Sequence, residues 1–173
     1  RNLGEINSFD SYQFSSDESK IIVGTNSEKI FRRSSRADFY VYDRLTKRLS
    51  RIAAYKIQEP LFSPDGSKVA YAFENNLYVK DLISGKTTQI TSDGQVNKII
   101  NGVTDWVYEE EFYFVRAFEW NTGSDKIAFI RFDESEVPEF AMDMYGNELY
   151  PGQMVFKYPK AGEKNSVVSL HLY

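Results

Sequence analysis

The chain has 173 residues, enough for one domain with a hydrophobic core, and its 12 Tyr and 13 Phe favour strands over helices. A net charge of −4, with no basic stripe, argues against nucleic acid as a partner. The absence of Cys excludes disulfides and a thiol nucleophile, and a single His makes a zinc site improbable, so we expect neither metal nor cofactor. No apolar run approaches the length of a membrane span.

Three segments along the chain resemble one another: residues 14–23, 62–71 and 120–129. Each has an aromatic residue, a polar turn, a Lys and then an apolar strand. The turn at Pro64-Asp65-Gly66 has a physical basis, because Pro presets φ and Gly supplies a positive φ. The similar segments recur at intervals of about 50 residues, which is typical of a repeat architecture.

Each turn is followed by further strands joined by short polar turns. In the second repeat we expect strands near 59–62, 68–74, 76–81 and 87–91. A four-stranded antiparallel unit that recurs at this interval is the signature of a β-propeller blade. The sequence predicts an all-β fragment with blades near 11–52 and 59–91 and an incomplete blade from about 116 to 173. This is about two and a half blades, of the four to eight that a propeller needs.

The third repeat is preceded by an extra segment, residues 101–114, which contains three consecutive carboxylates, Glu109-Glu110-Glu111. Large aromatic residues surround them: Trp106, Tyr108, Phe112, Tyr113 and Phe114. Because aromatic side chains favour burial while adjacent carboxylates need water or a cation, this segment predicts a partly buried anionic pocket for a cation. We expect a short helix or turn near 105–113. The alternative is that the carboxylates form only the charged face of a short helix.

A second departure is the long excursion over residues 133–162, rich in Pro, Gly and Tyr. Loops of this length in compact domains are usually functional or disordered, and we expect residues 137–162 to form an extended arm. Strand character returns at residues 167–173. We interpret His171 there as an ordinary strand residue rather than a ligand.

These motifs resemble known families. Phe62-Ser63-Pro64-Asp65-Gly66 is similar to turns in TolB-type propellers and in prolyl-oligopeptidase-type serine peptidases. The run from Asn101 to Phe112 resembles the double-glutamate segment of the dipeptidyl peptidase IV family nearly letter for letter. The segments Phe31-Arg32-Arg33-Ser34, Glu136-Val137-Pro138 and Tyr158-Pro159-Lys160-Ala161-Gly162 also match that family in register, and the resemblance extends from about Ser11 to Tyr173.

The resemblance implies an eight-bladed propeller that covers an α/β-hydrolase domain and an enzyme that releases Xaa-Pro or Xaa-Ala dipeptides from free N-termini. By similarity, Glu110 and Glu111 bind the substrate's α-ammonium and Arg32 binds a substrate carbonyl, whereas Glu109 is not a substrate ligand. Arg33 and Arg36 compete with Arg32 for this role. Residues 138–160 would reach the partner subunit of a homodimer.

The catalytic machinery is missing from the pattern, since the chain has no Gly-x-Ser-x-Gly elbow and no plausible triad. We therefore expect no catalytic residue here, an inactive fragment, and a hydrolase domain outside this chain. The competing hypothesis is a TolB-type propeller that serves only as a protein-interaction platform. The resemblance implies export to the periplasm, cell surface or extracellular space, and the lack of an Asn-x-Ser/Thr sequon slightly favours a bacterial source.

Overall fold

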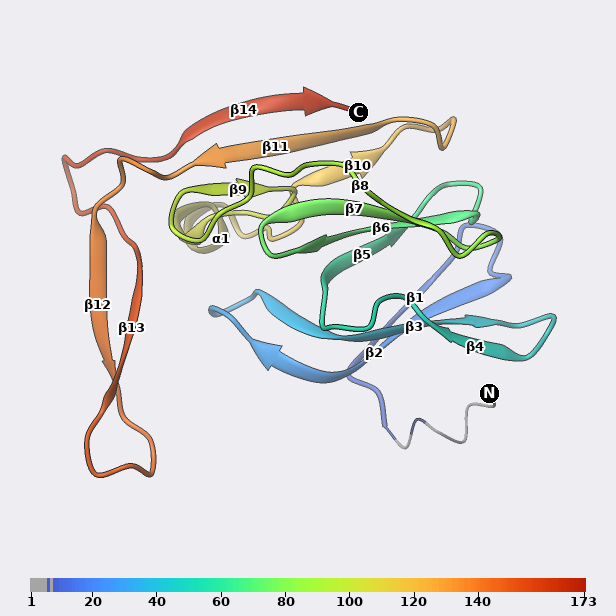
Figure 1. Ribbon diagram of the computed structural model, residues 1–173, viewed down its shortest axis with the longest axis horizontal. Coiled ribbons are helices and arrows are strands. Elements are labelled where there is room, and N and C mark those ends of the chain that lie inside the picture. Colours follow the sequence, from blue (N-terminus) through green and yellow to red (C-terminus); the bar gives the residue numbers. More distant parts are fainter. Residues whose placement is uncertain (1–5, 7) are drawn as a thin grey trace.

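The computed structural model describes Ile6 and residues 8–173, which are almost entirely β-strand (Figure 1). The strands in chain order are β1 (Ser11–Phe14), β2 (Lys20–Lys29), β3 (Ser35–Asp43), β4 (Arg48–Arg51), β5 (Gln58–Phe62), β6 (Lys68–Phe73), β7 (Asn76–Asp81), β8 (Thr87–Gln89), β9 (Ile99–Asn101), β10 (Phe118–Trp120), β11 (Ile127–Asp133), β12 (Glu139–Met144), β13 (Gly152–Lys157) and β14 (Val167–Leu172). One helix, α1 (Trp106–Phe112), lies between β9 and β10. None of the described residues form a helix long and apolar enough to cross a membrane.

The strands form antiparallel sheets in the order β1-β2-β3-β4, β5-β6-β7-β8 and β10-β11-β14, with β9 also paired to β11. These three sheets stack face to face, and β12 and β13 form a separate hairpin that extends away from the stack (Figure 1). The expected fold class, an all-β propeller fragment of four-stranded antiparallel sheets, is confirmed.

Hydrogen-bonded turns explain why the sequence repeats. Ser63 Oγ donates to Asp65 Oδ1 at 2.6 Å, and the Ser63 amide donates to the Lys68 carbonyl at 2.9 Å. Ser15 and Asp17 form the same hydroxyl–carboxylate bond at 2.7 Å in the first repeat. These hydrogen bonds favour the ionised carboxylates and hold the pKa of Asp17 and of Asp65 below their usual range. Turn chemistry therefore fixes where each second strand begins.

Apolar side chains fill the spaces between the stacked sheets. The space between the first and second sheets contains Ile22, Val41, Ile52, Ile57, Phe62, Val69 and Tyr71. The space between the second and third sheets contains Leu61, Ala70, Leu77, Val79, Phe118, Ile127 and Phe129. The second sheet thus buries both of its faces, and the first and third sheets each bury the face that is turned toward it.

The third sheet corrects one sequence expectation. The segment around residues 101–114 was expected before the first strand of this sheet, but β9 lies in the sheet already. β9 pairs with residues 131–133 of β11 and β10 pairs with residues 127–129, so both strands lie along one edge of β11. The insertion therefore interrupts the first strand of this sheet, whose two parts are β9 and β10, rather than preceding that strand. A strand of three residues, such as β9, is too short to show the alternation of apolar and polar residues by which a strand is recognised in a sequence.

The two ends of the insertion lie next to each other where they join the sheet. Gly102 has a φ of 77°, a conformation that disfavours residues with a side chain, and an added Cβ would lie only 3.1 Å from Leu77 and 3.3 Å from Phe118. The Ala117 amide donates to the Gly102 carbonyl at 2.9 Å, and the Thr104 amide donates to the Val115 carbonyl at 3.0 Å. These bonds place the start and end of the insertion side by side, so that α1 projects from a fixed base.

Candidate functional site

The three glutamates lie on α1, which begins and ends by recognisable rules. The side chain of Asp105 caps the first turn by accepting a hydrogen bond from the Tyr108 amide at 2.9 Å. Tyr113 ends the helix in the left-handed conformation, with a φ of 63°. The prediction of a short helix near 105–113 is confirmed.

Helix geometry sends the three consecutive carboxylates into three environments, because successive side chains on a helix point about 100° apart. Glu109 is only 1% exposed and points into the protein. The side chain of Glu110 is 14% exposed, and Glu111 lies in solvent. The three glutamates therefore differ in which groups their carboxylates can contact.

Glu109 contacts the turn between β2 and β3. Its Oε1 accepts hydrogen bonds from the amide of Arg33 at 2.6 Å and from the amide of Ser34 at 2.8 Å. Its Oε2 is buried and has no hydrogen-bond partner among the described residues. The β2–β3 turn is thereby held against α1, at the end of the stack from which the β12–β13 hairpin also extends (Figure 1).

The β2–β3 turn places Arg32 beside the helix. Arg32 Nε lies 3.1 Å from Glu110 Oε2, and 74% of the Arg32 side chain is exposed. Arg33 instead stacks its guanidinium on the Tyr113 ring, 4.5 Å from the ring centroid, and Arg36 pairs with Glu28 at 2.9 Å. Of the three competing arginines, Arg32 is the one paired with a glutamate of the run.

The structure joins Arg32 to Glu110 but leaves Glu111 apart. Within Ile6 and residues 8–173, no ion pair to Glu111 occurs. The pair of Arg32 and Glu110 can accept a cation at the carboxylate and donate to an oxygen at the guanidinium, which has five N–H donors. The arrangement thus presents opposite charges at one place on the surface.

The aromatic residues around the glutamates are divided between packed and exposed side chains. Trp106 packs against Tyr158, with ring centroids 4.5 Å apart, and Tyr108 packs against Phe132 at 5.0 Å. Phe112 is 60% exposed and Tyr113 is 70% exposed. Since α1 has one buried face, aromatic residues spread around a full turn cannot all be covered.

The root of the hairpin forms a buried polar cluster behind α1 that sequence reasoning missed. The hydroxyl of Ser166 donates to the Asp105 carboxylate, and Lys157 Nζ donates to the Val137 carbonyl at 2.8 Å. Burial raises the pKa of Glu134 to about 7, helped by the negative charge of Asp105 and opposed by Lys157. No local sequence pattern indicates this cluster, because its members are far apart in the sequence and meet only in the folded chain.

A cavity of about 210 Å³ is lined by residues of both the hairpin root and the β2–β3 turn, whose Phe156 and Phe31 rings lie 5.8 Å apart. Its lining includes Phe31, Ser34, Asp105, Trp106, Phe156 and Lys157. Arg32, Glu110 and Glu111 do not line this cavity.

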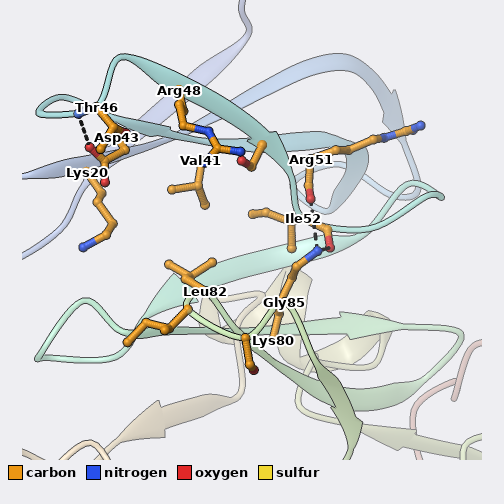
Figure 2. A pocket seen from close by; sticks show the side chains of 13 residues that line it. Lys20, Val41, Asp43, Thr46, Arg48, Arg51, Ile52, Lys80, Leu82 and Gly85 are labelled. Atoms are coloured by element: carbon orange, nitrogen blue, oxygen red, sulfur yellow. Dashed lines mark hydrogen bonds between the residues drawn. The ribbon is translucent and has the colours of Figure 1, made fainter. Parts of the chain in front are cut away.

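A larger cavity, of about 450 Å³, lies between the outer strands of the first and second sheets (Figure 2). Two of its cations have partners: Lys80 Nζ donates to the carbonyls of Ile52 at 2.7 Å and of Arg51 at 3.1 Å, and Arg51 pairs with Asp38. Lys80 therefore joins the outer strands of two sheets. The cavity contains none of the candidate site residues, so its size alone does not make it the functional site.

Comparison with known proteins agrees with the architecture. The family model described as "Dipeptidyl peptidase IV (DPP IV) N-terminal region" matches residues 15–173. Human "Prolyl endopeptidase FAP" is 37% identical over 164 residues, covering 93% of this chain and 22% of that protein. "Dipeptidyl aminopeptidase B" of Saccharomyces cerevisiae is 35% identical over 164 residues, covering 92% of this chain and 20% of that protein.

Among solved structures, the crystal structure of Porphyromonas gingivalis dipeptidyl peptidase 4 matches with a TM-score of 0.92 and 44% identity. The match covers 97% of this chain and 24% of that one. The chain therefore spans about a fifth to a quarter of the length of these relatives. By the extent of the family match and the agreement of the fold, the chain belongs to the dipeptidyl peptidase IV family and corresponds to its N-terminal region.

Proposed function

We propose that this chain is the part of a serine-type dipeptidyl aminopeptidase that recognises the N-terminus of the peptide substrate. The observation that carries the proposal is the pairing of Arg32 with Glu110 at 3.1 Å, on a helix whose sequence resembles the family's double-glutamate segment. The chain has no nucleophile elbow, so the catalytic serine would lie in another part of the full-length protein.

The proposed mechanism is electrostatic recognition. A free α-ammonium donates three hydrogen bonds, and charge-assisted bonds of this kind contribute about 1.5–3 kcal/mol each. Glu110 accepts one from its place beside Arg32, and Glu111, exposed on the next position of α1, supplies the second carboxylate. Arg32 has N–H groups beyond the one that faces Glu110, and these donate to the carbonyl oxygen of the first substrate residue.

Two carboxylates at a fixed distance from the nucleophile measure substrate length. A peptide whose ammonium is bound at α1 can present only one peptide bond to the catalytic serine, so the product is a dipeptide. A Pro or Ala at the second position would be selected at the catalytic end of the cleft, as the family resemblance implies.

The test is product analysis with the full-length protein. A peptide with a free N-terminus and Pro at position 2 should release its first two residues as a dipeptide, detected by mass spectrometry. The control is the same peptide with Pro moved to position 3, which should stay intact. No cleavage of either peptide, or release of products of another length, would contradict the proposal and favour a non-catalytic interaction platform.

We further propose that the β12–β13 hairpin is the arm of a homodimer. Its strands and tip carry apolar side chains that are between 37% and 89% exposed: Phe140, Met142, Met144, Tyr145, Leu149, Tyr150 and Val155. An apolar surface of this extent on a projecting hairpin is typical of an association site. The hairpin also pairs only with itself, which leaves both of its edges available.

The arm proposal is tested by sedimentation velocity of the full-length protein and two matched variants. Leu149, at the tip of the hairpin, and Leu45, in the β3–β4 turn, are both 89% exposed. Leu149→Asp should convert the dimer to a monomer, whereas Leu45→Asp should leave the dimer intact. A monomeric wild type, or a Leu149→Asp protein that still sediments as a dimer at micromolar concentration, would overturn the proposal.

An exported setting, whether periplasmic, cell-surface or extracellular, is proposed from the family resemblance alone. Fractionation of the cells that produce the protein, followed by activity measurement in each fraction, would decide it. Activity confined to the cytoplasmic fraction would exclude export.

A further inference from the structure

We propose that Glu109 is a positioning residue, which sets the distance between Arg32 and Glu110 by holding the β2–β3 turn against α1. This inference rests on the proposed function and extends it to a residue that does not touch substrate. The buried carboxylate of Glu109 thereby determines how closely the exposed guanidinium of Arg32 approaches the substrate peptide.

The geometry of the contact supports this role. The two amides that donate to Glu109 Oε1, at 2.6 and 2.8 Å, belong to Arg33 and Ser34, the residues directly after Arg32. The peptide plane that carries the Arg33 amide also contains the carbonyl of Arg32. Fixing that plane therefore fixes the backbone from which the Arg32 side chain extends.

The other contacts between the turn and α1 are solvent-exposed. Arg33 stacks on Tyr113, and Arg32 pairs with Glu110 through a side chain that is mostly in water. Exposed charge pairs contribute little to rigidity, whereas a buried carboxylate with two backbone donors is held tightly. Among the described contacts, the hydrogen bonds to Glu109 are thus the ones suited to set the geometry.

The two backbone amides of the turn explain why a carboxylate, and not an apolar residue, occupies this position. Burying a charge without a cation is costly unless hydrogen-bond donors satisfy it. An apolar residue would fill the space beneath α1 but would leave the amides of Arg33 and Ser34 unpaired. The carboxylate is explained by what it accepts, since both backbone donors are satisfied by one of its oxygens.

Two substitutions of Glu109 separate the effect of side-chain length from the effect of charge. Glu109→Gln keeps an oxygen at the same distance from the backbone and removes the charge, and the unpartnered Oε2 position is where its amide nitrogen would lie. Glu109→Asp keeps the charge but is one methylene shorter, so it cannot reach both amides. If positioning is the role, the Gln variant should be the milder of the two.

The experiment measures kcat/KM of the full-length enzyme for a chromogenic Xaa-Pro substrate, with thermal unfolding to verify that each variant is folded. A misplacement of about 1 Å in a binding group costs up to about a hundredfold in rate, so we expect Glu109→Asp to lose about ten- to a hundredfold. Glu109→Gln should recover most of that loss. Equal losses in both variants would show that reach alone does not account for the role of Glu109, and a larger loss in Glu109→Gln than in Glu109→Asp would show that charge matters instead; either result would overturn the inference.

A double-mutant cycle with Arg32→Ala shows whether Glu109 acts through the arginine. In the Arg32→Ala background, adding Glu109→Asp should cost much less than it does in the wild type. The same fold loss in both backgrounds would mean that Glu109 only supports the fold. If Glu109→Asp does not accumulate as a folded protein, the Gln variant decides, because a folded Glu109→Gln enzyme without activity would contradict the proposal.

Failure of the proposed function is recognised separately. Glu110→Gln should impair the enzyme whatever Glu109 does, because Glu110 is proposed to touch the substrate. An unimpaired Glu110→Gln enzyme would remove the proposed function itself. An impaired Glu110→Gln enzyme combined with a fully active Glu109→Asp enzyme would remove only the present inference.

Discussion

Replacing Glu110 by Ala in the full-length enzyme should lower kcat/KM for Xaa-Pro substrates by about a hundredfold or more. The substitution leaves the substrate ammonium without one of its two carboxylates, and a loss of about 3 kcal/mol of transition-state stabilisation corresponds to this factor. It also removes the partner of Arg32, whose guanidinium lies 3.1 Å from Glu110. Steady-state kinetics with a chromogenic dipeptide substrate would measure the change.

The variants around Glu110 give the prediction its controls. Glu111→Ala should cause a loss of similar size, and Arg32→Ala should cause a smaller one because it removes a contact to a neutral carbonyl. Glu136 is a matched control, since it is ion-paired with Lys164 at 3.0 Å but lies in solvent outside α1. Glu136→Ala should leave kcat/KM unchanged. A Glu110→Ala enzyme as active as the Glu136→Ala enzyme would show that Glu110 does not bind substrate.

Much of the fold was predictable because it depends on local chemistry. The repeated turns at Ser15 and Ser63 are built from hydroxyl–carboxylate and backbone hydrogen bonds within six residues, so the pattern is visible in the sequence. The short helix was predictable for the same reason, because its cap, Asp105, lies three residues before the amide it accepts from. Local rules place elements when both partners of an interaction are close in sequence.

The features that escaped prediction join distant parts of the chain. Glu109 lies about 75 residues from the two amides that it binds, and no pattern in the glutamate run indicates which carboxylate turns inward. Strand β9 is too short to show alternation and is defined only by its pairing with β11. The exposure of Phe112 and Tyr113 follows from which face of α1 meets the core, a property of packing rather than of composition.

The candidate site could be predicted as a set of residues but not as a geometry. Similarity to the family's motif indicated Arg32, Glu110 and Glu111. The contact between Arg32 and Glu110 depends on a turn that folds back onto a helix far along the chain. The contacts of Glu109 with the β2–β3 turn and of Glu110 with Arg32 therefore emerge only from the structure.

Acetylation of the substrate's N-terminus should abolish cleavage by the wild-type enzyme, lowering kcat/KM by at least about a hundredfold, which corresponds to about 3 kcal/mol. Acetylation replaces an ammonium that donates three charge-assisted hydrogen bonds by a neutral amide that donates one, and it leaves the carboxylates of Glu110 and Glu111 without a cation. Rates for a free and an acetylated Xaa-Pro peptide, followed by product release, would measure the difference. Amidation of the same peptide's C-terminus is the control and should change little.

Comparing free and acetylated peptides in the Glu110→Ala variant tests whether Glu110 itself recognises the ammonium. If Glu110 recognises the ammonium, the variant should discriminate less between free and acetylated peptides, because part of the interaction that acetylation removes is already missing. Undiminished discrimination would assign recognition of the N-terminus to other residues. Similar cleavage of both peptides by the wild type would mean that no charge is read at the N-terminus, and the three glutamates of α1 would then be only the charged face of a short helix.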